Sequence, residues 1–177
     1  MNRVANFIGF QIGWFACVLG AAYGFLWLGP AVVALLALLN LYERHPSQRL
    51  SEVRLLGLAC LLGLLLDSLL AAAGVFTFLD RQLPPWLSRP WMVALWANFA
   101  LTLRSSMTWL QGRYPLAALL GAISGPLAYW AGARLGAVEL NGLYSILFLA
   151  AVWLPTVPLL LWLSADPPKT DTGEVRC

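Results

Sequence analysis

The chain has 177 residues, of which 60% are hydrophobic and only 11% are charged, whereas soluble proteins contain about 45–50% apolar and about 25% charged residues. Its mean hydropathy of +0.76 predicts an integral membrane protein. Six membrane spans of about 20 residues would use about 120 residues, which leaves no room for a water-soluble catalytic domain. The net charge of +3 comes from scattered residues, which excludes the clustered basic surface that binds nucleic acid.

The apolar residues form six segments of membrane-spanning length. Residues 7–42 are too many for one span, and Gly24 and the Gly29-Pro30 pair indicate a break within them. The charged residues 43–49 and the Pro-rich residues 79–90 are typical of loops, and residues 112–115 and 139–142 are typical of turns. The predicted spans are Phe7–Tyr23, Leu26–Tyr42, Val53–Phe78, Trp91–Leu110, Leu116–Gly136 and Leu143–Leu163.

The basic residues are unevenly distributed over the predicted loops. If both termini share one side, that side carries Arg3, Arg44, Arg49, Arg54, Arg104, Arg113, Lys169 and Arg176, against Arg81, Arg89 and Arg134 on the other. Because basic residues concentrate on the cytoplasmic side, this asymmetry predicts cytoplasmic termini in a bacterial inner membrane. We therefore predict an all-α polytopic bundle of six helices, a single transmembrane domain over residues 1–163, followed by a polar, disordered cytoplasmic tail over residues 164–177.

Two predicted spans carry a stripe of small residues. The members of each stripe are spaced by four, three, four and four positions, which places them on one helix face. Small residues let membrane helices approach closely, so the stripes predict packing within the bundle. A duplicated helical hairpin and a docking face for another membrane subunit are the alternatives. The stripes are Gly9, Gly13, Ala16, Gly20 and Gly24 in the first span, and Gly121, Gly125, Ala128, Gly132 and Gly136 in the fifth.

Asp67 lies inside the third predicted span. It shares a helix face with Gly63 and Ala71, so we expect its carboxylate to point toward protein. Counted back from Phe78, it lies near the bilayer centre, where a carboxylate needs a partner or a role. Arg104 in the fourth predicted span has a similar depth, and we hypothesise an intramembrane Asp67–Arg104 ion pair. The alternative is that Arg104 extends to the cytoplasmic headgroups.

The fourth predicted span also carries a polar stripe, formed by Asn98, Thr102 and Ser105. Such a stripe lines a site or path for a polar or amphipathic molecule, or it makes hydrogen bonds between helices. Asn6, Gln11, Ser124 and Tyr129 belong to spans that are able to meet it. The candidate ligand-binding residues are Asp67, Arg104, Asn98, Thr102, Ser105 and Gln11.

The sequence lacks the residue sets of intramembrane enzymes. His45 is its single histidine, so neither a zinc protease nor a Ser-His protease can be assembled. Asp67 has no second mid-membrane carboxylate for an aspartyl pair, and no Gly-Lys-Ser/Thr phosphate loop is present. The three cysteines show no zinc-type spacing. We expect no metal, no cofactor and no catalytic residues, and an enzyme acting on lipid ranks lowest among the alternatives.

Several segments spread over most of the chain resemble an uncharacterised bacterial inner-membrane family classed as a domain of unknown function. They include Gln11-Ile12-Gly13-Trp14-Phe15-Ala16-Cys17, Pro90-Trp91 through Leu95-Trp96, Asn98-Phe99-Ala100 and Gly121-Ala122 to Tyr129. The resemblance implies genes near those of cyclopropane-fatty-acid synthase-like enzymes, and hence a lipid context, but it assigns no catalytic residue. The size, the six spans and the small-residue first helix are also similar to substrate-binding components of energy-coupling-factor vitamin transporters.

These features predict a non-enzymatic, multi-pass inner-membrane protein that binds or transports a lipid or small amphipathic molecule. Membrane lipid is then its expected partner. The alternative is an accessory or scaffold subunit whose glycine stripes dock a lipid-modifying enzyme or a transporter.

Overall fold

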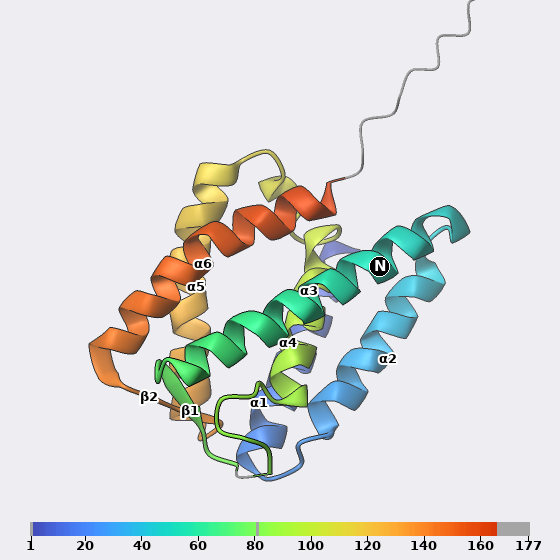
Figure 1. The fold of residues 1–177 in the computed structure, drawn as a ribbon. Coiled ribbons are helices and arrows are strands. Elements are labelled where there is room, and N and C mark those ends of the chain that lie inside the picture. Colours follow the sequence, from blue (N-terminus) through green and yellow to red (C-terminus); the bar gives the residue numbers. More distant parts are fainter. Residues whose placement is uncertain (1, 81, 166–177) are drawn as a thin grey trace, which may run out of the picture.

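The computed structural model describes residues 2–80 and 82–165. Six α-helices, a single-turn 3-10 helix and two three-residue strands make up this part of the chain (Figure 1). In chain order the elements are α1 (Arg3–Ala22), α2 (Leu28–Glu43), α3 (Pro46–Ala72), β1 (Phe76–Phe78), α4 (Pro90–Leu103), η1 (Thr108–Leu110), α5 (Tyr114–Arg134), β2 (Val138–Leu140) and α6 (Gly142–Ser164).

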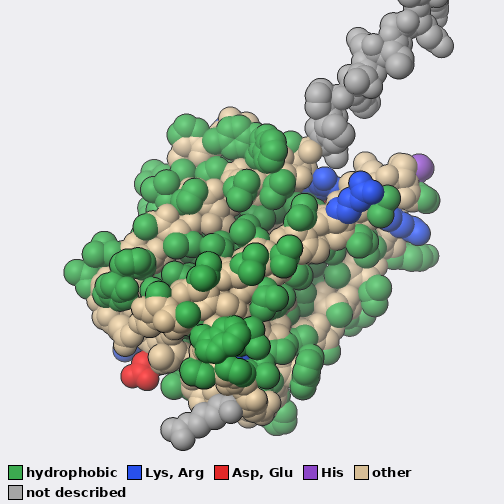
Figure 2. Space-filling model, viewed as in Figure 1, with side chains coloured by type: hydrophobic (Ala, Val, Ile, Leu, Met, Phe, Trp, Pro, Cys, Tyr) green, Lys and Arg blue, Asp and Glu red, His purple; other side chains and the backbone are tan. Residues whose placement is uncertain are grey.

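Four of the helices, α1, α3, α5 and α6, are long and apolar enough to cross a membrane. The apolar helices α2 and α4 have 16 and 14 residues, so they extend about 24 and 21 Å, against about 30 Å of hydrocarbon. Large hydrophobic side chains are exposed over the face in Figure 2, and arginines gather at one end of it. The predicted helical membrane-type fold is confirmed, whereas six spans and cytoplasmic termini stay predictions.

Helix α4 lies at the centre of the bundle. It packs against α1, α2 and α3, and more weakly against α6, while α5 packs mainly against α6. Figure 1 shows α5 and α6 on one side of α4 and α2 on the other, while α1 runs behind α4. Helix α4 is therefore the common packing partner of α1, α2, α3 and α6.

The strands β1 and β2 pair antiparallel, with Phe76 opposite Leu140 and Phe78 opposite Val138. They follow α3 and α5, so their hydrogen bonds connect the ends of two helices that are distant in sequence. The prediction of a simple turn at residues 139–142 is wrong at residues 139 and 140, because both belong to β2. A three-residue strand is too short for its alternation pattern to be recognised in the sequence.

The boundaries predicted for the third span are also wrong. Helix α3 begins at Pro46, so residues 46–49 form its first turn and are not part of a loop. Proline is favoured at the first helical position, because the N–H group that it lacks would have no hydrogen-bond partner within the helix. The helix ends at Ala72, and Gly74 follows with a φ of +69°, a conformation that glycine adopts readily.

The fourth predicted span, Trp91–Leu110, is interrupted. Helix α4 ends at Leu103, and a turn leads from Arg104 to the short helix η1. The amide of Met107 donates to the carbonyl of Thr102, which closes this turn. Arg104 therefore follows a helix end instead of occupying a helix interior, and its side chain reaches the polar groups of neighbouring helix ends.

The described residues between β1 and α4 form the predicted loop, and Arg89 organises it. The Arg89 side chain is 1% exposed. Its Nε donates to both carboxylate oxygens of Asp80 at 2.9 Å, and its terminal nitrogens donate to the carbonyls of Asp80, Leu83, Pro84 and Leu87. The guanidinium also lies 4.5 Å from the centre of the Phe78 ring. One side chain thus replaces the missing backbone hydrogen bonds of an irregular segment.

Candidate functional site: an aromatic groove between two helices

A groove of about 480 Å³ lies between α1 and α5, with α4 as its floor. The lining residues Gln11 and Phe15 of α1, and Ser124, Leu127 and Ala128 of α5, are exposed, so the groove opens at the surface between these two helices. Eight aromatic residues contribute to its walls: Phe10, Trp14, Phe15, Trp91, Trp96, Phe99, Tyr129 and Trp153.

The floor of the groove is a stack of indole rings. The rings of Trp96 and Trp153 are stacked with their centres 5.0 Å apart, and Phe99 meets Trp153 edge-on. A side chain at Gly63 would overlap the Trp96 ring, and one at Gly125 would overlap the Trp153 ring. The two glycines therefore make room for the stack, which brings α3, α4, α5 and α6 together.

Asp67 lies directly behind this floor and is fully buried. One carboxylate oxygen accepts a hydrogen bond from Trp96 Nε1 at 2.7 Å, and the other accepts one from the Tyr129 hydroxyl. Trp96 and Tyr129 both line the groove, but Asp67 does not. The Asp67 carboxylate, on α3, therefore holds two groove-lining side chains in place, Trp96 of α4 and Tyr129 of α5.

The hypothesis of an Asp67–Arg104 ion pair is wrong. Both Asp67 oxygens are bonded to Trp96 and Tyr129, whereas Arg104 Nε donates to the Ser164 carbonyl at 2.8 Å and Nη1 donates to Ser51 Oγ at 2.9 Å. Trp96 and Arg104 are eight residues apart, about 12 Å along a helix. The depth of Asp67 was predicted by counting back from Phe78. Because α3 ends at Ala72, Asp67 is only five residues from the end of its helix.

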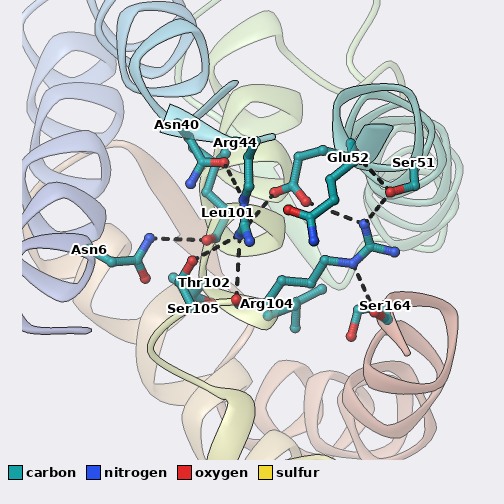
Figure 3. Close-up of polar contacts among 12 residues, drawn as sticks. Asn6, Asn40, Arg44, Ser51, Glu52, Leu101, Thr102, Arg104, Ser105 and Ser164 are labelled. Atoms are coloured by element: carbon teal, nitrogen blue, oxygen red, sulfur yellow. Dashed lines mark hydrogen bonds and ion pairs between the residues drawn. The ribbon is translucent and has the colours of Figure 1, made fainter. Parts of the chain in front are cut away.

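Arg104 instead belongs to an ion cluster around Glu52 at the opposite end of α4 (Figure 3). The Glu52 side chain is 1% exposed and lies 3.4 Å from Arg104 Nη1 and 3.8 Å from Arg44 Nη2. Arg44 also donates to Ser105 Oγ at 3.1 Å. Sequence reasoning missed Glu52. The available signal was its position on the same buried face of α3 as Ala59, Gly63 and Asp67.

The polar stripe of α4 makes hydrogen bonds with α1 and with its own backbone. Asn98 Nδ2 donates to the Phe10 carbonyl at 2.8 Å, and Asn6 Nδ2 donates to the Leu101 carbonyl at 3.0 Å. The Thr102 hydroxyl donates to the Phe99 carbonyl at 2.6 Å. The six candidate residues are thus divided: Gln11 lines the groove, Asp67 lies behind it, Asn98 and Thr102 lie beside α1, and Arg104 and Ser105 join the ion cluster.

The glycines of the two stripes mostly face this chain's own residues. A Cβ at Gly13 would lie 2.5 Å from Asn98 Oδ1, and one at Gly121 would lie 2.5 Å from the Trp153 carbonyl oxygen. Gly20 faces the α1–α2 turn, while Gly9 and Gly132 have looser contacts with Leu36 and Val138. Gly24 and Gly136 lie beyond the helix ends, and both have a φ of +84°.

The described residues contain no group of three or more His, Cys, Asp or Glu side chains placed to hold a metal ion. The predicted tail lies almost wholly outside them. Ser164 is the buried last residue of α6, Ala165 follows it, and residues 166–177 are outside the part that the structure describes.

The fold and the groove define a small helical protein of membrane type, with a lateral aromatic cavity as its candidate site. Residues 3–159 match the model of the family described as "Protein of unknown function (DUF2878)". The match covers most of the chain, so the chain belongs to this family, and the resemblance to an uncharacterised family is confirmed. Comparison with curated proteins gives no match, and neither does comparison with solved structures.

Proposed function

We propose that this protein binds a lipid or small amphipathic molecule in the groove between α1 and α5. The groove is the single observation that supports this function. Its volume of about 480 Å³ falls within the roughly 300–1,000 Å³ typical of small-molecule sites. Its aromatic and aliphatic lining suits an apolar ligand, because burying apolar surface is favourable and aromatic rings provide large contact areas.

The proposed setting is the bacterial inner membrane, with six spans and both termini in the cytoplasm. The arginines support this orientation: Arg44, Arg49, Arg54 and Arg104 gather at the end of the bundle where α2 joins α3 and α4 ends. In this setting the groove opens sideways, toward the lipids that surround the bundle. The lipid context implied by the family resemblance agrees with such a ligand.

The glycine stripes give less support to an accessory or scaffold role. Gly13 faces Asn98, and Gly125 faces Trp153, so these positions already pack against the protein's own side chains. A partner would need a different surface. We therefore treat capture of a protein partner as a result that would overturn the ligand-binding proposal.

Native mass spectrometry of the protein, extracted gently from its own membrane, tests the function. We expect a discrete small-molecule adduct that is lost in Ala128→Phe, because Ala128 lines the groove and a ring there would fill it. Ala151→Phe is the matched control, since Ala151 is an exposed alanine on α6 that does not line the groove. A protein partner at fixed stoichiometry without an adduct, or an adduct that persists in Ala128→Phe, would contradict the proposal.

A further inference from the structure

Two polar side chains, Gln11 and Ser124, face the groove from opposite walls. Helices α1 and α5 run in the same direction, and their final turns meet where a Cβ at Gly136 would lie 3.9 Å from Ala22 Cβ. Gln11 is eight residues from the start of α1 and Ser124 is ten residues from the start of α5. These separations are about 12 and 15 Å, so the amide and the hydroxyl lie at similar heights. Both lie near the end of the groove that is closer to the helix starts, because its lining runs from Phe10 to Val18 on α1 and from Ser124 to Gly132 on α5.

Neither side chain has a hydrogen-bond partner among the described residues, although both belong to helices of membrane-spanning length. Asn6 and Asn98, the other amides on the inner part of α1 and α4, donate to backbone carbonyls. An unpaired amide or hydroxyl in hydrocarbon is unfavourable by several kcal/mol on alkane transfer scales. An occupant of the groove that carries a hydrogen-bonding group would remove this penalty.

The groove lining contains no charged residue. Arg104 is engaged with Ser164 and Ser51, and Arg89 with Asp80. Arg134, two residues beyond the lining residue Gly132, lies over the ring of Trp130, which does not line the groove. Asp67 is fully buried, and each of its oxygens already accepts a hydrogen bond from a groove residue. The groove therefore offers no counter-ion of either sign, neither a cation for a carboxylate or phosphate nor a carboxylate for an ammonium group.

We propose that the ligand is a neutral lipid with a hydroxyl or carbonyl group along its chain or at its end, held between Gln11 and Ser124. This inference rests on the proposed function and narrows it to one ligand class. Gln11 both donates and accepts hydrogen bonds, and Ser124 does the same, so the pair serves an alcohol as well as a ketone or ester. The remainder of the ligand lies against the Trp96 and Trp153 rings.

Four probes of equal chain length test the ligand class: octadecane, octadecanol, octadecanoic acid and octadecylamine. Each is titrated into the full-length protein in phosphatidylcholine nanodiscs, and native mass spectrometry gives the fraction of protein that retains it. We expect octadecanol to bind about ten-fold more tightly than octadecane, the difference that one or two hydrogen bonds produce. We also expect the acid and the amine to bind no better than the alkane.

The variants Gln11→Leu and Ser124→Ala, alone and combined, identify the site. The double variant should bind octadecanol and octadecane equally. Gln82→Leu is the matched control, because Gln82 is an exposed glutamine in the loop before α4. Both test positions are exposed, so folding should be unaffected, as monodispersity and thermal unfolding will show.

The possible outcomes separate this inference from the proposed function. Equal binding of alcohol and alkane by the unaltered protein, or preferred binding of the acid or the amine, overturns the neutral-lipid inference and leaves the groove as a binding site. Loss of alcohol preference in Gln82→Leu also overturns it, because the preference would then arise elsewhere. Failure of every probe to bind overturns the proposed function itself.

Discussion

Asp67 supports the walls of the groove without lining it. Its carboxylate accepts hydrogen bonds from Trp96 and Tyr129, so it sets the orientation of two aromatic walls from behind. Buried polar groups destabilise a protein mainly when one partner is removed and the other is left unpaired. The carboxylate and its two donors should therefore behave as one unit when they are mutated.

We expect Asp67→Leu to destabilise the protein more than Asp67→Asn, by about 1–3 kcal/mol, because asparagine keeps one acceptor for the two donors. Unfolding in a mild detergent, followed by tryptophan fluorescence, measures the difference. Adding Tyr129→Phe to Asp67→Leu should cost less than the sum of the two single changes, since no hydroxyl is then orphaned. Strict additivity would show that Tyr129 and Asp67 act independently.

Glu52 provides a second test at the scale of a residue. It is buried between Arg44 and Arg104, and removal of one member of a buried ion cluster leaves the other charges uncompensated. We expect Glu52→Gln to lower the free energy of unfolding by about 3 kcal/mol. Glu139→Gln, a change of the same kind at an exposed position on β2, should have little effect. Equal losses of unfolding free energy in the two variants would show that the Glu52 cluster does not stabilise the protein.

At the scale of the element, close approach of helices depends on individual glycines rather than on whole stripes. Helix α3 contains two glycines with contrasting surroundings. Gly63 lies against the Trp96 ring, whereas Gly57 has no atom within 4 Å of the position of a Cβ. The two positions share one helix, so the helix-forming tendency of a substituted residue is the same at both.

Gly57→Ala should stabilise the protein by up to about 1 kcal/mol, because alanine is the better helix former. Gly63→Ala should instead destabilise it by about 1–3 kcal/mol, because the new methyl group overlaps the Trp96 ring and forces the stack to move. Thermal unfolding of both variants under one detergent condition tests this. A stabilising effect at Gly63 would mean that the indole stack adapts without strain.

The loop before α4 is another element held by a single side chain. Arg89→Met removes every hydrogen bond that the guanidinium makes to Asp80 and to the loop carbonyls. We expect chymotrypsin cleavage near Trp86 to become faster while the helices stay folded, because local opening needs less free energy than global unfolding. Arg134→Met, at an exposed arginine that lies over Trp130, should leave the cleavage rate unchanged.

How much of the structure could be predicted from the sequence differs from element to element. The six apolar segments all became helices, since hydrophobic runs and Gly or Pro breaks are local signals. The predicted pairing of Asp67 failed because its partner Tyr129 is 62 residues away, and no local pattern reports such a contact. Arg104 was misplaced because α4 ends at Leu103, and its contacts with Ser164 and Ser51 join residues that are distant in the sequence, which no local pattern in residues 91–110 reports.

For the whole molecule, the polar interactions lie mainly at the two ends of the helices. The Glu52 cluster joins the ends of α2, α4 and α6 to α3 at one end, and the β1–β2 pair with the Arg89 loop closes the other. Apolar side chains fill the space between them. This distribution is typical of a protein whose middle section lies in hydrocarbon.

The orientation prediction is tested by cysteine labelling in whole cells. In a Cys60→Ala, Cys177→Ser background, Gln48→Cys reports the α2–α3 end and Thr77→Cys reports the strand end, since both side chains are exposed. We expect a membrane-impermeant maleimide to label Thr77→Cys at least ten-fold faster than Gln48→Cys. The reverse pattern would invert the proposed topology and leave the structure of the bundle unchanged.

The lateral opening of the groove has a consequence for how affinity must be measured. If the groove binds a lipid as proposed, acyl chains of neighbouring lipids would fill the space between α1 and α5 whenever the specific ligand is absent. Binding would then be an exchange of one lipid for another, and its apparent constant would include the concentration of the lipid displaced. The meaningful quantity is a preference, expressed as a mole ratio in the membrane, and it will change with the composition of the bilayer that supplies the competitor.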